Sequence, residues 1–398
     1  MTVLIDCINN KSVSSIPVWF MRQAGRYLPE FRDIRSKNKD FVKLCLNPEL
    51  SKDITLQPLN RFNIDAAIIF SDILLIPFAL GQQLRFEKNF GPILGELRSE
   101  NIIDVKNDEI TKKLQPVYNL LKFTSSDPKM KNKDLIGFIG ATWTLLVYML
   151  NQKSPKKNIE VDIFNYPHLD KLINKIIETQ KIHIKKQIES GASIIQIFDS
   201  WAGLLEINKY NKYIYEPTKI LVEYTKSLGK NVICFPRGIK NYKEYCNIVK
   251  PSAISIDYEV DPLEIAKNIK VGPGMNDKDG SQMGPLVSGE QYEKVVGYME
   301  SGKQDGAECL VGGTHDNSNG GHFVHPTVFS KTNADMKFVK EEIFGPVLTT
   351  QKITDDDLNS IASEANNTEF GLAASVWSKD ISTAHKMAAK IKAGTVWI

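Results

Sequence analysis

The chain has 398 residues, enough for two or three ordinary domains, and 42% of them are hydrophobic and 24% charged. These values are typical of globular proteins and exclude a disordered tail, a collagen-like fibre and a disulfide scaffold. Fifty Lys and Arg against 47 Asp and Glu give a formal net charge of +3. So small an excess does not indicate a nucleic-acid-binding protein.

The average conceals two parts of different composition. After Lys270 the chain has 11 Lys, no Arg and 17 Asp plus Glu, a net charge of −6, whereas the preceding part has 39 basic and 30 acidic residues, a net charge of +9. Glycine follows the same division, with 10 of the 25 in the first part and 15 in the second. We therefore expect two units of separate origin, residues 1–269 and 270–398.

The cysteines and the apolar segments indicate a cytoplasmic location. The five cysteines are scattered and include no CxxC pair, which predicts reduced thiols and no metal site. Residues 135–152 carry no charge, but they contain two Gly, two Thr and a polar end. Because a spanning helix needs about 20 mainly apolar residues, we predict a buried strand running into a helix, and no membrane partner.

In the first part, short apolar runs alternate with amphipathic stretches such as Leu169–Glu189, whose apolar residues have helical spacing. The runs lack strict alternation, as expected of parallel strands covered on both faces. This order predicts an α/β fold. Arg22, Asp72 and Ser200 come just after predicted strand ends, which is where a (β/α)8 barrel carries its active site. Such a barrel needs eight strands, and six are predicted, at residues 17–21, 66–70, 135–140, 193–198, 231–236 and 253–258.

The second part has a different sequence pattern. It starts with a Gly- and Pro-rich loop and continues with shorter elements separated by turn-rich segments. We expect a second, smaller α/β unit. Its predicted helices are residues 288–301, 356–366 and 381–393, and its predicted strands or apolar runs are residues 323–329, 346–350, 372–377 and 395–398.

Two arginines follow the first apolar run, in PVWFMRQAGRYLPEF. Arg22 and Arg26 lie four residues apart, and two guanidinium groups at this spacing can bind one polyanion, because Arg forms bidentate bonds with carboxylates. The alternative is a pair of solvated surface arginines in ion pairs, which the spacing alone favours.

Asp72 lies inside the apolar run FSDIL. A carboxylate there is costly unless it is paired or used, and it is suited to several N–H donors or to a developing cation. An N-cap of the following helix is an equally good interpretation. Ser200 has no His in its local motif, which argues against a Ser–His hydrolase.

These segments, together with GFIGATWTLLVYM and QIFDSWAG, resemble the uroporphyrinogen decarboxylase family from about residue 10 to about residue 268. The resemblance implies a (β/α)8 barrel, usually a homodimer. It also implies removal of four acetate carboxyls from uroporphyrinogen, to give coproporphyrinogen in haem biosynthesis, without a cofactor. The substrate is then a porphyrinogen.

The same resemblance implies roles for individual residues. Asp72 matches the carboxylate that accepts the pyrrole N–H bonds and stabilises the protonated ring. The residues that match substrate-binding positions are Arg22 and Arg26 for carboxylates, Tyr148 and Ser200 for polar contacts, and Phe198 for an apolar wall. Residues after the sixth strand depart from the family, because its QGNLDP-like segment and its GHG-like loop with an active-site His are absent.

Five motifs of the second part, among them EEIFGPV and ANNTEFGLAASVW, resemble the catalytic domain of NAD(P)-dependent aldehyde dehydrogenases over about residues 270–398. Glu342 matches the carboxylate that binds the nicotinamide-ribose hydroxyls, and Phe344 matches the aromatic residue beside it. In that family the dinucleotide-binding fold and the nucleophilic Cys precede this region, and Cys309 is predicted to be an apolar filler. We therefore expect neither NAD(P) binding nor aldehyde oxidation.

The two resemblances meet between about residues 265 and 275, inside one domain and not at a linker, which predicts a chimera. The first functional hypothesis is a uroporphyrinogen decarboxylase-like enzyme. The second is a catalytically inactive chain that at most binds porphyrinogen or other polyanions, because an incomplete barrel leaves strand edges unpaired and loses stability. Aldehyde dehydrogenase activity ranks third.

Overall fold

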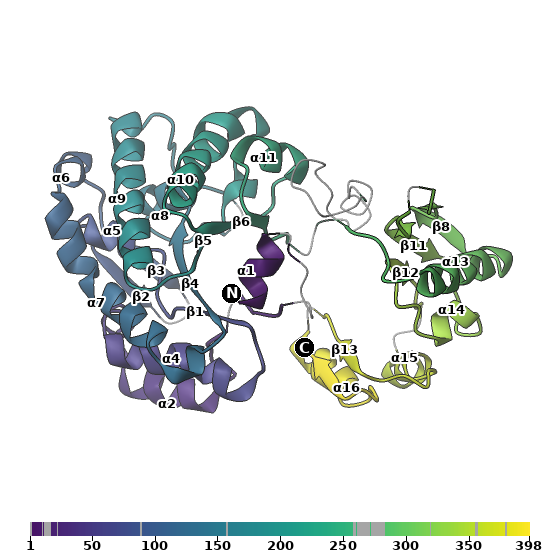
Figure 1. Ribbon diagram of the computed structural model, residues 1–398. Coiled ribbons are helices and arrows are strands. Elements are labelled where there is room, and N and C mark those ends of the chain that lie inside the picture. Colours follow the sequence, from purple (N-terminus) through teal and green to yellow (C-terminus); the bar gives the residue numbers. More distant parts are fainter. Residues whose placement is uncertain are drawn as a thin grey trace. The chain divides into compact units, whose positions relative to one another are not determined.

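The chain forms two compact units in the computed structural model, Met1–Glu259 (unit 1) and Val260–Ile398 (unit 2), each described by itself (Figure 1). No helix of the described residues is long and apolar enough to cross a membrane. The structure describes residues 2–9, 11, 17–21, 23–87, 90–156, 158–257, 260, 271, 283–318, 320–354, 357–378 and 380–398.

Unit 1 is built on a sheet of five parallel strands in the order β1-β4-β5-β6-β7. Each strand forms at one of the predicted apolar runs. The parallel sheet confirms the α/β barrel-like prediction for this part of the chain. The strands are β1 Ala66–Ile68, β4 Asp134–Gly140, β5 Ile194–Asp199, β6 Asn231–Pro236 and β7 Ala253–Ile254.

The strand predicted at residues 17–21 is wrong, because no strand forms there. Val18 exchanges two hydrogen bonds with Asp65: its N–H donates to Asp65 Oδ2 (2.7 Å) and its carbonyl accepts from the Asp65 N–H (2.8 Å). Further along the chain, the buried side-chain amide of Gln23 forms hydrogen bonds with the edge of β1: it donates to the Ala66 carbonyl (2.7 Å) and accepts from the Ile68 N–H (3.0 Å). A side chain thus pairs with the groups that another backbone strand would have used.

Helices cover one face of this sheet, as Figure 1 shows for α4, α7, α9 and α10. The helix predicted at Leu169–Glu189 is confirmed as α9, and residues 135–152 form β4 followed by α8, as predicted. The helices of unit 1 are α1 Val3–Ile8, α2 Pro29–Lys37, α3 Phe41–Cys45, α4 Pro48–Arg61, α5 Leu75–Ala79, α6 Ser99–Ile103, α7 Asn107–Ser125, α8 Thr142–Asn151, α9 Leu169–Glu189, α10 Glu216–Ser227 and α11 Tyr242–Val249. A two-stranded hairpin, β2 Leu84–Glu87 and β3 Gly91–Leu94, lies between α5 and α6.

The other face of the sheet packs against α1. Leu4, 5% exposed, joins a buried cluster of apolar side chains from the four longer strands: Ala66 and Ile68 of β1, Ile136 of β4, Ile194 of β5 and Ile233 of β6. The hydroxyl of Thr2 donates to Asp134 Oδ2 at 2.5 Å and fixes the start of the helix. The N-terminal helix therefore covers inner-face apolar surface that lies against further strands in a closed barrel.

Unit 2 is a smaller α/β fragment. Helix α13 packs its buried Tyr292, Val295 and Met299 against Phe329 and Phe338 of a three-stranded sheet in the order β12-β11-β8 and its flanking helix. Strand β11 is parallel to β12 and antiparallel to β8. The elements are α13 Gly289–Gln304, β8 Glu308–Val311, β9 His315–Asp316, β10 Phe323–Val324, β11 Thr327–Ser330, α14 Lys337–Lys340, β12 Val347–Thr349, α15 Leu358–Ala365, β13 Ala373–Ser375, α16 Ile381–Ala388 and β14 Thr395–Trp397.

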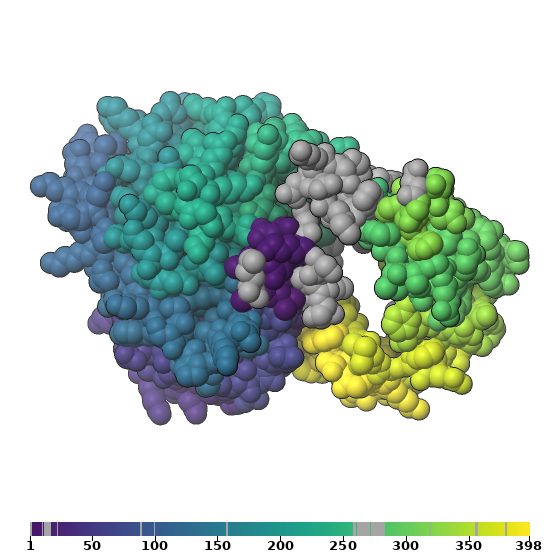
Figure 2. All heavy atoms as spheres, viewed as in Figure 1, coloured from purple at the N-terminus to yellow at the C-terminus, as the bar shows by residue number. Residues whose placement is uncertain are grey.

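The last segment of unit 2 leaves large apolar side chains exposed. Trp377 is 87% exposed, Leu372 84% and Ile381 65%. They belong to the part of the chain coloured yellow in Figure 2. These side chains lie on β13 and α16 or next to them, and so much exposed apolar surface is typical of a fragment separated from the rest of its domain.

Candidate active site

A cavity of about 440 Å³ opens where the parallel strands of unit 1 end. Its wall is made by the turns that follow β1, β5 and β6, with contributions from α3, α8 and the β2–β3 hairpin. Four residues predicted from the sequence line it together: Asp72, Tyr148, Phe198 and Ser200. The carboxyl ends of the strands are where a (β/α)8 barrel carries its active site.

Aromatic rings form much of the wall. Phe41 lies edge-to-face against Phe86 and Phe70, with ring centroids 4.6 and 5.8 Å apart. Phe138 and Phe198 from neighbouring strands form a second pair at 5.5 Å. These rings give the cavity an apolar lining in which electrostatic interactions are stronger than in water.

Asp72 is the acidic residue of this lining. It is half-buried, and its Oδ1 accepts a hydrogen bond from the Leu74 N–H at 2.8 Å. Helix α5 begins at Leu75 with Leu74 as its N-cap residue, so Asp72 is not the N-cap. Burial raises the pKa of Asp72 to about 6, and the Leu74 N–H opposes the rise only in part. Above pH 6 the cavity therefore holds a poorly solvated anion.

Ser200 occupies a turn that the buried side of α8 holds in place. The hydroxyl of Thr144 donates to Asp199 Oδ1 at 2.6 Å and accepts from the Trp201 N–H at 3.1 Å. Asp199 is 2% exposed, and burial raises its pKa to about 7 despite the bond from Thr144. Tyr148, also on α8, accepts a hydrogen bond from Ser154 Oγ at 3.5 Å. The hydroxyl groups of Tyr148 and Ser200 thus come from α8 and from the turn that α8 fixes.

The two predicted arginines are not brought into this cavity by the described residues. Arg22 lies outside the described residues, and Arg26 is exposed and is not part of the described lining. The arginine that does line the cavity is Arg237, which the sequence reasoning missed. It directly follows β6, as Ser200 follows β5, and that position was the available signal.

The residues predicted for nucleotide binding lie in unit 2. Glu342 is half-buried and Phe344 is 70% exposed, with a positive φ of 51°. The side-chain amide of Gln291 holds this turn by donating to the Ile343 and Phe344 carbonyls at 2.9 and 3.1 Å. One carboxylate and one exposed ring do not amount to a dinucleotide site.

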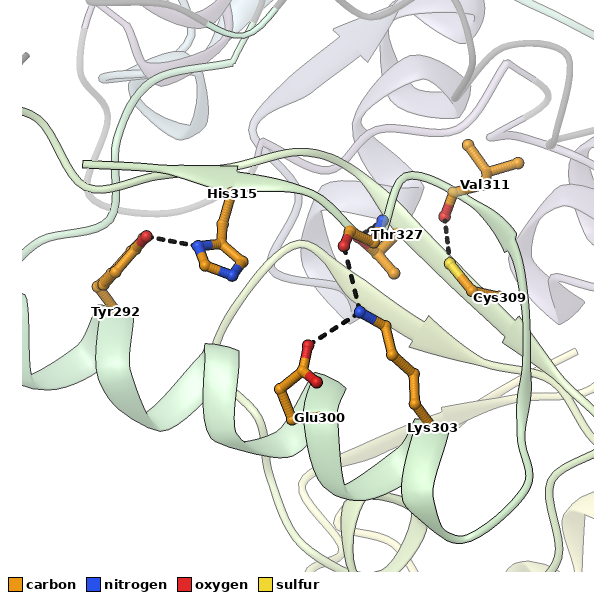
Figure 3. Close-up of polar contacts among 8 residues, drawn as sticks. Tyr292, Glu300, Lys303, Cys309, Val311, His315 and Thr327 are labelled. Carbon is orange, nitrogen blue, oxygen red and sulfur yellow. Dashed lines mark hydrogen bonds and ion pairs between the residues drawn. The ribbon is translucent and has the colours of Figure 1, made fainter. Parts of the chain in front are cut away.

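Cys309 has a structural setting, as Figure 3 shows. Its thiol donates to the Val311 carbonyl at 3.3 Å, and its side chain packs against the buried cluster of unit 2. In the same view Lys303 pairs with Glu300 at 2.9 Å, and the Tyr292 hydroxyl lies 2.6 Å from His315 Nδ1. Cys309 therefore packs as an apolar filler, as predicted. Among the described residues, no group of three or more His, Cys, Asp or Glu side chains is arranged to hold a metal ion.

The fold of unit 1 defines a barrel-type α/β protein with a cavity at its strand ends. The family model described as "Uroporphyrinogen decarboxylase (URO-D)" matches residues 1–276, and the one described as "Aldehyde dehydrogenase family" matches residues 261–398. The chain belongs to the uroporphyrinogen decarboxylase family, with a C-terminal fragment of the aldehyde dehydrogenase family joined to it. The predicted chimera is confirmed.

Individual relatives support the match to the uroporphyrinogen decarboxylase family. A uroporphyrinogen decarboxylase of Chelativorans sp. is 36% identical over 346 residues, covering 85% of this chain and 98% of the relative. One from Campylobacter jejuni is 39% identical over 273 residues, 67% of this chain and 79% of the relative. A methyltransferase structure from Methanosarcina mazei is 14% identical with a TM-score of 0.53, over 76% of this chain and 89% of that one, a likeness of fold alone.

Proposed function

We propose that the cavity of unit 1 binds uroporphyrinogen and that the chain converts it to coproporphyrinogen by removing CO2 from four acetate side chains. The observation that carries this proposal is the carboxylate of Asp72, held among aromatic walls at the strand ends with a pKa of about 6. Family membership and the named relatives support the choice of substrate.

In the proposed mechanism Asp72 acts as an anion. Protonation of a pyrrole carbon makes the ring a cation, and the Asp72 carboxylate accepts the pyrrole N–H bonds and stabilises that charge. The bond from the acetate CH2 to its carboxylate then breaks, CO2 leaves, and its electron pair neutralises the ring. A second proton then adds to the carbon that lost CO2, and the first proton leaves the pyrrole carbon, so each acetate consumes one proton in total. The aromatic walls exclude water and strengthen the attraction between anion and cation.

The remaining groups of the site are proposed to hold the substrate. Ser200 and Tyr148 offer hydroxyl donors to carboxylates, and Phe198 supplies an apolar surface for a ring. Arg22 and Arg26 stay predictions from the resemblance. We also propose a homodimer in the cytoplasm and a reaction that needs no cofactor or metal, so full activity should remain after dialysis against a chelator.

A second candidate is a chain that binds porphyrinogen without turning it over. It is favoured by the sheet of unit 1, which has five strands among the described residues where a closed barrel has eight. The same binding groups are present in either case, so binding and turnover must be measured separately.

The test is an anaerobic assay of the purified full-length chain for coproporphyrinogen, with Asp72→Asn as the diagnostic variant. Asp53→Asn is the matched control, because Asp53 is exposed on α4 and does not line the cavity. Turnover that Asp72→Asn abolishes and Asp53→Asn leaves intact supports the decarboxylase. Binding without turnover supports the second candidate, and neither binding nor turnover would reject both.

A further inference from the structure

Arg237 is the cavity residue that the proposed function leaves without a task. It lines the cavity together with Asp72 and Ser200, and its side chain is exposed. Within the described part of the chain, its guanidinium group forms no ion pair and no hydrogen bond. An unpaired guanidinium group at the edge of an apolar cavity is available to an anionic ligand.

The backbone around Arg237 is fixed although its side chain is not. The Arg237 N–H donates to the Asp199 carbonyl at 3.0 Å, and the Arg237 carbonyl accepts from the Gly203 N–H at 2.9 Å. The next residue, Gly238, has a φ of +77° and donates to Asp257 Oδ2 at 2.6 Å. The backbone at Arg237 is therefore already ordered, and binding has to order only the side chain, which favours a binding role.

The register of the sheet places Arg237 beside Ser200. Phe198 pairs with Phe235 and Asp199 pairs with Pro236 across β5 and β6. Ser200 and Arg237 are the residues that follow these pairs, and neighbouring strands lie about 4.8 Å apart. Side chains that start from such neighbouring backbones and line the same cavity can reach one carboxylate.

We propose that Arg237 binds a carboxylate of the porphyrinogen, the same carboxylate that receives the hydroxyl group of Ser200. This inference rests on the proposed function and adds to it a fixed cation on the β5–β6 side of the cavity. Asp72, after β1, serves the pyrrole nitrogens, whereas Arg237 and Ser200 fix one acidic side chain of the macrocycle. Recognition therefore uses charges of opposite sign, both carried by turns that follow strands.

The test measures binding of uroporphyrinogen to the full-length chain by anaerobic equilibrium dialysis. Arg237→Gln should weaken binding at least tenfold, about 1.4 kcal/mol, and Arg237→Lys should recover part of the loss because it keeps the charge without the bidentate fork. The control is Arg98→Gln, since Arg98 is an exposed arginine beside Glu96 that does not line the cavity. It removes the same charge and should leave affinity unchanged.

A double-mutant cycle with Ser200→Ala tests whether both residues hold one carboxylate. The losses from Arg237→Gln and Ser200→Ala should then be non-additive. Normal binding by Arg237→Gln, equal weakening by Arg98→Gln, or additive losses would overturn the inference and leave the proposed function standing. Failure of the unmodified chain to bind uroporphyrinogen would overturn both. Thermal unfolding of Arg237→Gln should match the unmodified chain, because the Arg237 side chain has no partner to lose among the residues that the structure describes.

Discussion

Asp72→Asn should stabilise unit 1 at neutral pH while it abolishes turnover. The folded-state pKa of Asp72 is about 6, against 3.8 for an ordinary aspartate. The unfolded chain therefore releases its proton first as pH rises, so stability falls between pH 3.8 and 6, and the full penalty applies above pH 6. At 1.36 kcal/mol per pKa unit this is about 3 kcal/mol. Since Asp72 is only half-buried, we expect a gain of about 1 to 3 kcal/mol for the uncharged variant.

The measurement is urea unfolding of unit 1 at pH 7.5 and at pH 3.5. Replacing Trp377 and Trp397 of unit 2 by Phe leaves Trp19, Trp143 and Trp201 of unit 1 as fluorescent reporters. The stability gain of Asp72→Asn should be present at pH 7.5 and almost lost at pH 3.5, where the native carboxyl group is protonated in the folded state and mostly protonated in the unfolded chain.

The sign control is Asp127→Asn. Burial raises the pKa of Asp127, but the hydrogen bonds from Lys52 (3.0 Å) and from the Lys129 N–H (3.1 Å), together with the charges of both lysines, outweigh this and hold the pKa below its ordinary value. Removing the Asp127 charge should destabilise the fold at pH 7.5, opposite to the effect at Asp72. If Asp72→Asn were no more stable than the unmodified chain at pH 7.5, the cavity would not desolvate the carboxylate, and the electrostatic basis of the proposed mechanism would fail.

Two further predictions concern buried polar groups of unit 1. Gln196 is fully buried, and neither polar atom of its amide has a partner among the described residues. Gln196→Met should therefore raise the free energy of unfolding by about 1 to 2 kcal/mol. Unchanged or lower stability in urea would contradict the interpretation that the amide is buried without a hydrogen bond. Burial lowers the pKa of His183 to about 3, while its Nδ1 lies 3.2 Å from the Tyr118 hydroxyl. The unfolded chain therefore gains the proton near pH 6.5, and stability falls as pH drops from 6.5 towards 3. His183→Gln should flatten this part of the pH profile, and an unaltered slope between pH 7 and 4.5 would contradict the assignment.

Local patterns predicted most of the fold of unit 1. The apolar spacing of Leu169–Glu189 gave the bounds of α9, and the apolar runs from residue 66 onward became the strands. The prediction of a strand at residues 17–21 failed because pairing at the edge of β1 depends on residues far away in the sequence. The edge of β1 is taken by the amide of Gln23, 43 residues before Ala66, and no local pattern reveals such a contact.

The site was predictable where a local rule applied. Asp72 and Ser200 were found by their position after strands, and Tyr148 and Phe198 through the family resemblance. Arg237 obeys the same positional rule as Ser200, but an arginine after a strand is also an ordinary solvated residue. Only the cavity and the pairing of β5 with β6 distinguish the two interpretations.

The site of unit 1 is built from residues well before the overlap of the two family matches at residues 261–276. Asp72, Ser200 and Arg237 follow β1, β5 and β6, which adjoin one another through β4 in an unbroken parallel sheet. The edge of β1 is satisfied by Gln23, and α1 covers inner-face apolar surface. The junction therefore leaves this half of the cavity intact and removes the family's later strands and their loop. Under the proposed function, porphyrinogen binding uses groups that the chain retains, whereas the resemblance places an active-site His for turnover in the absent loop. We therefore expect binding to survive in variants and conditions that abolish turnover.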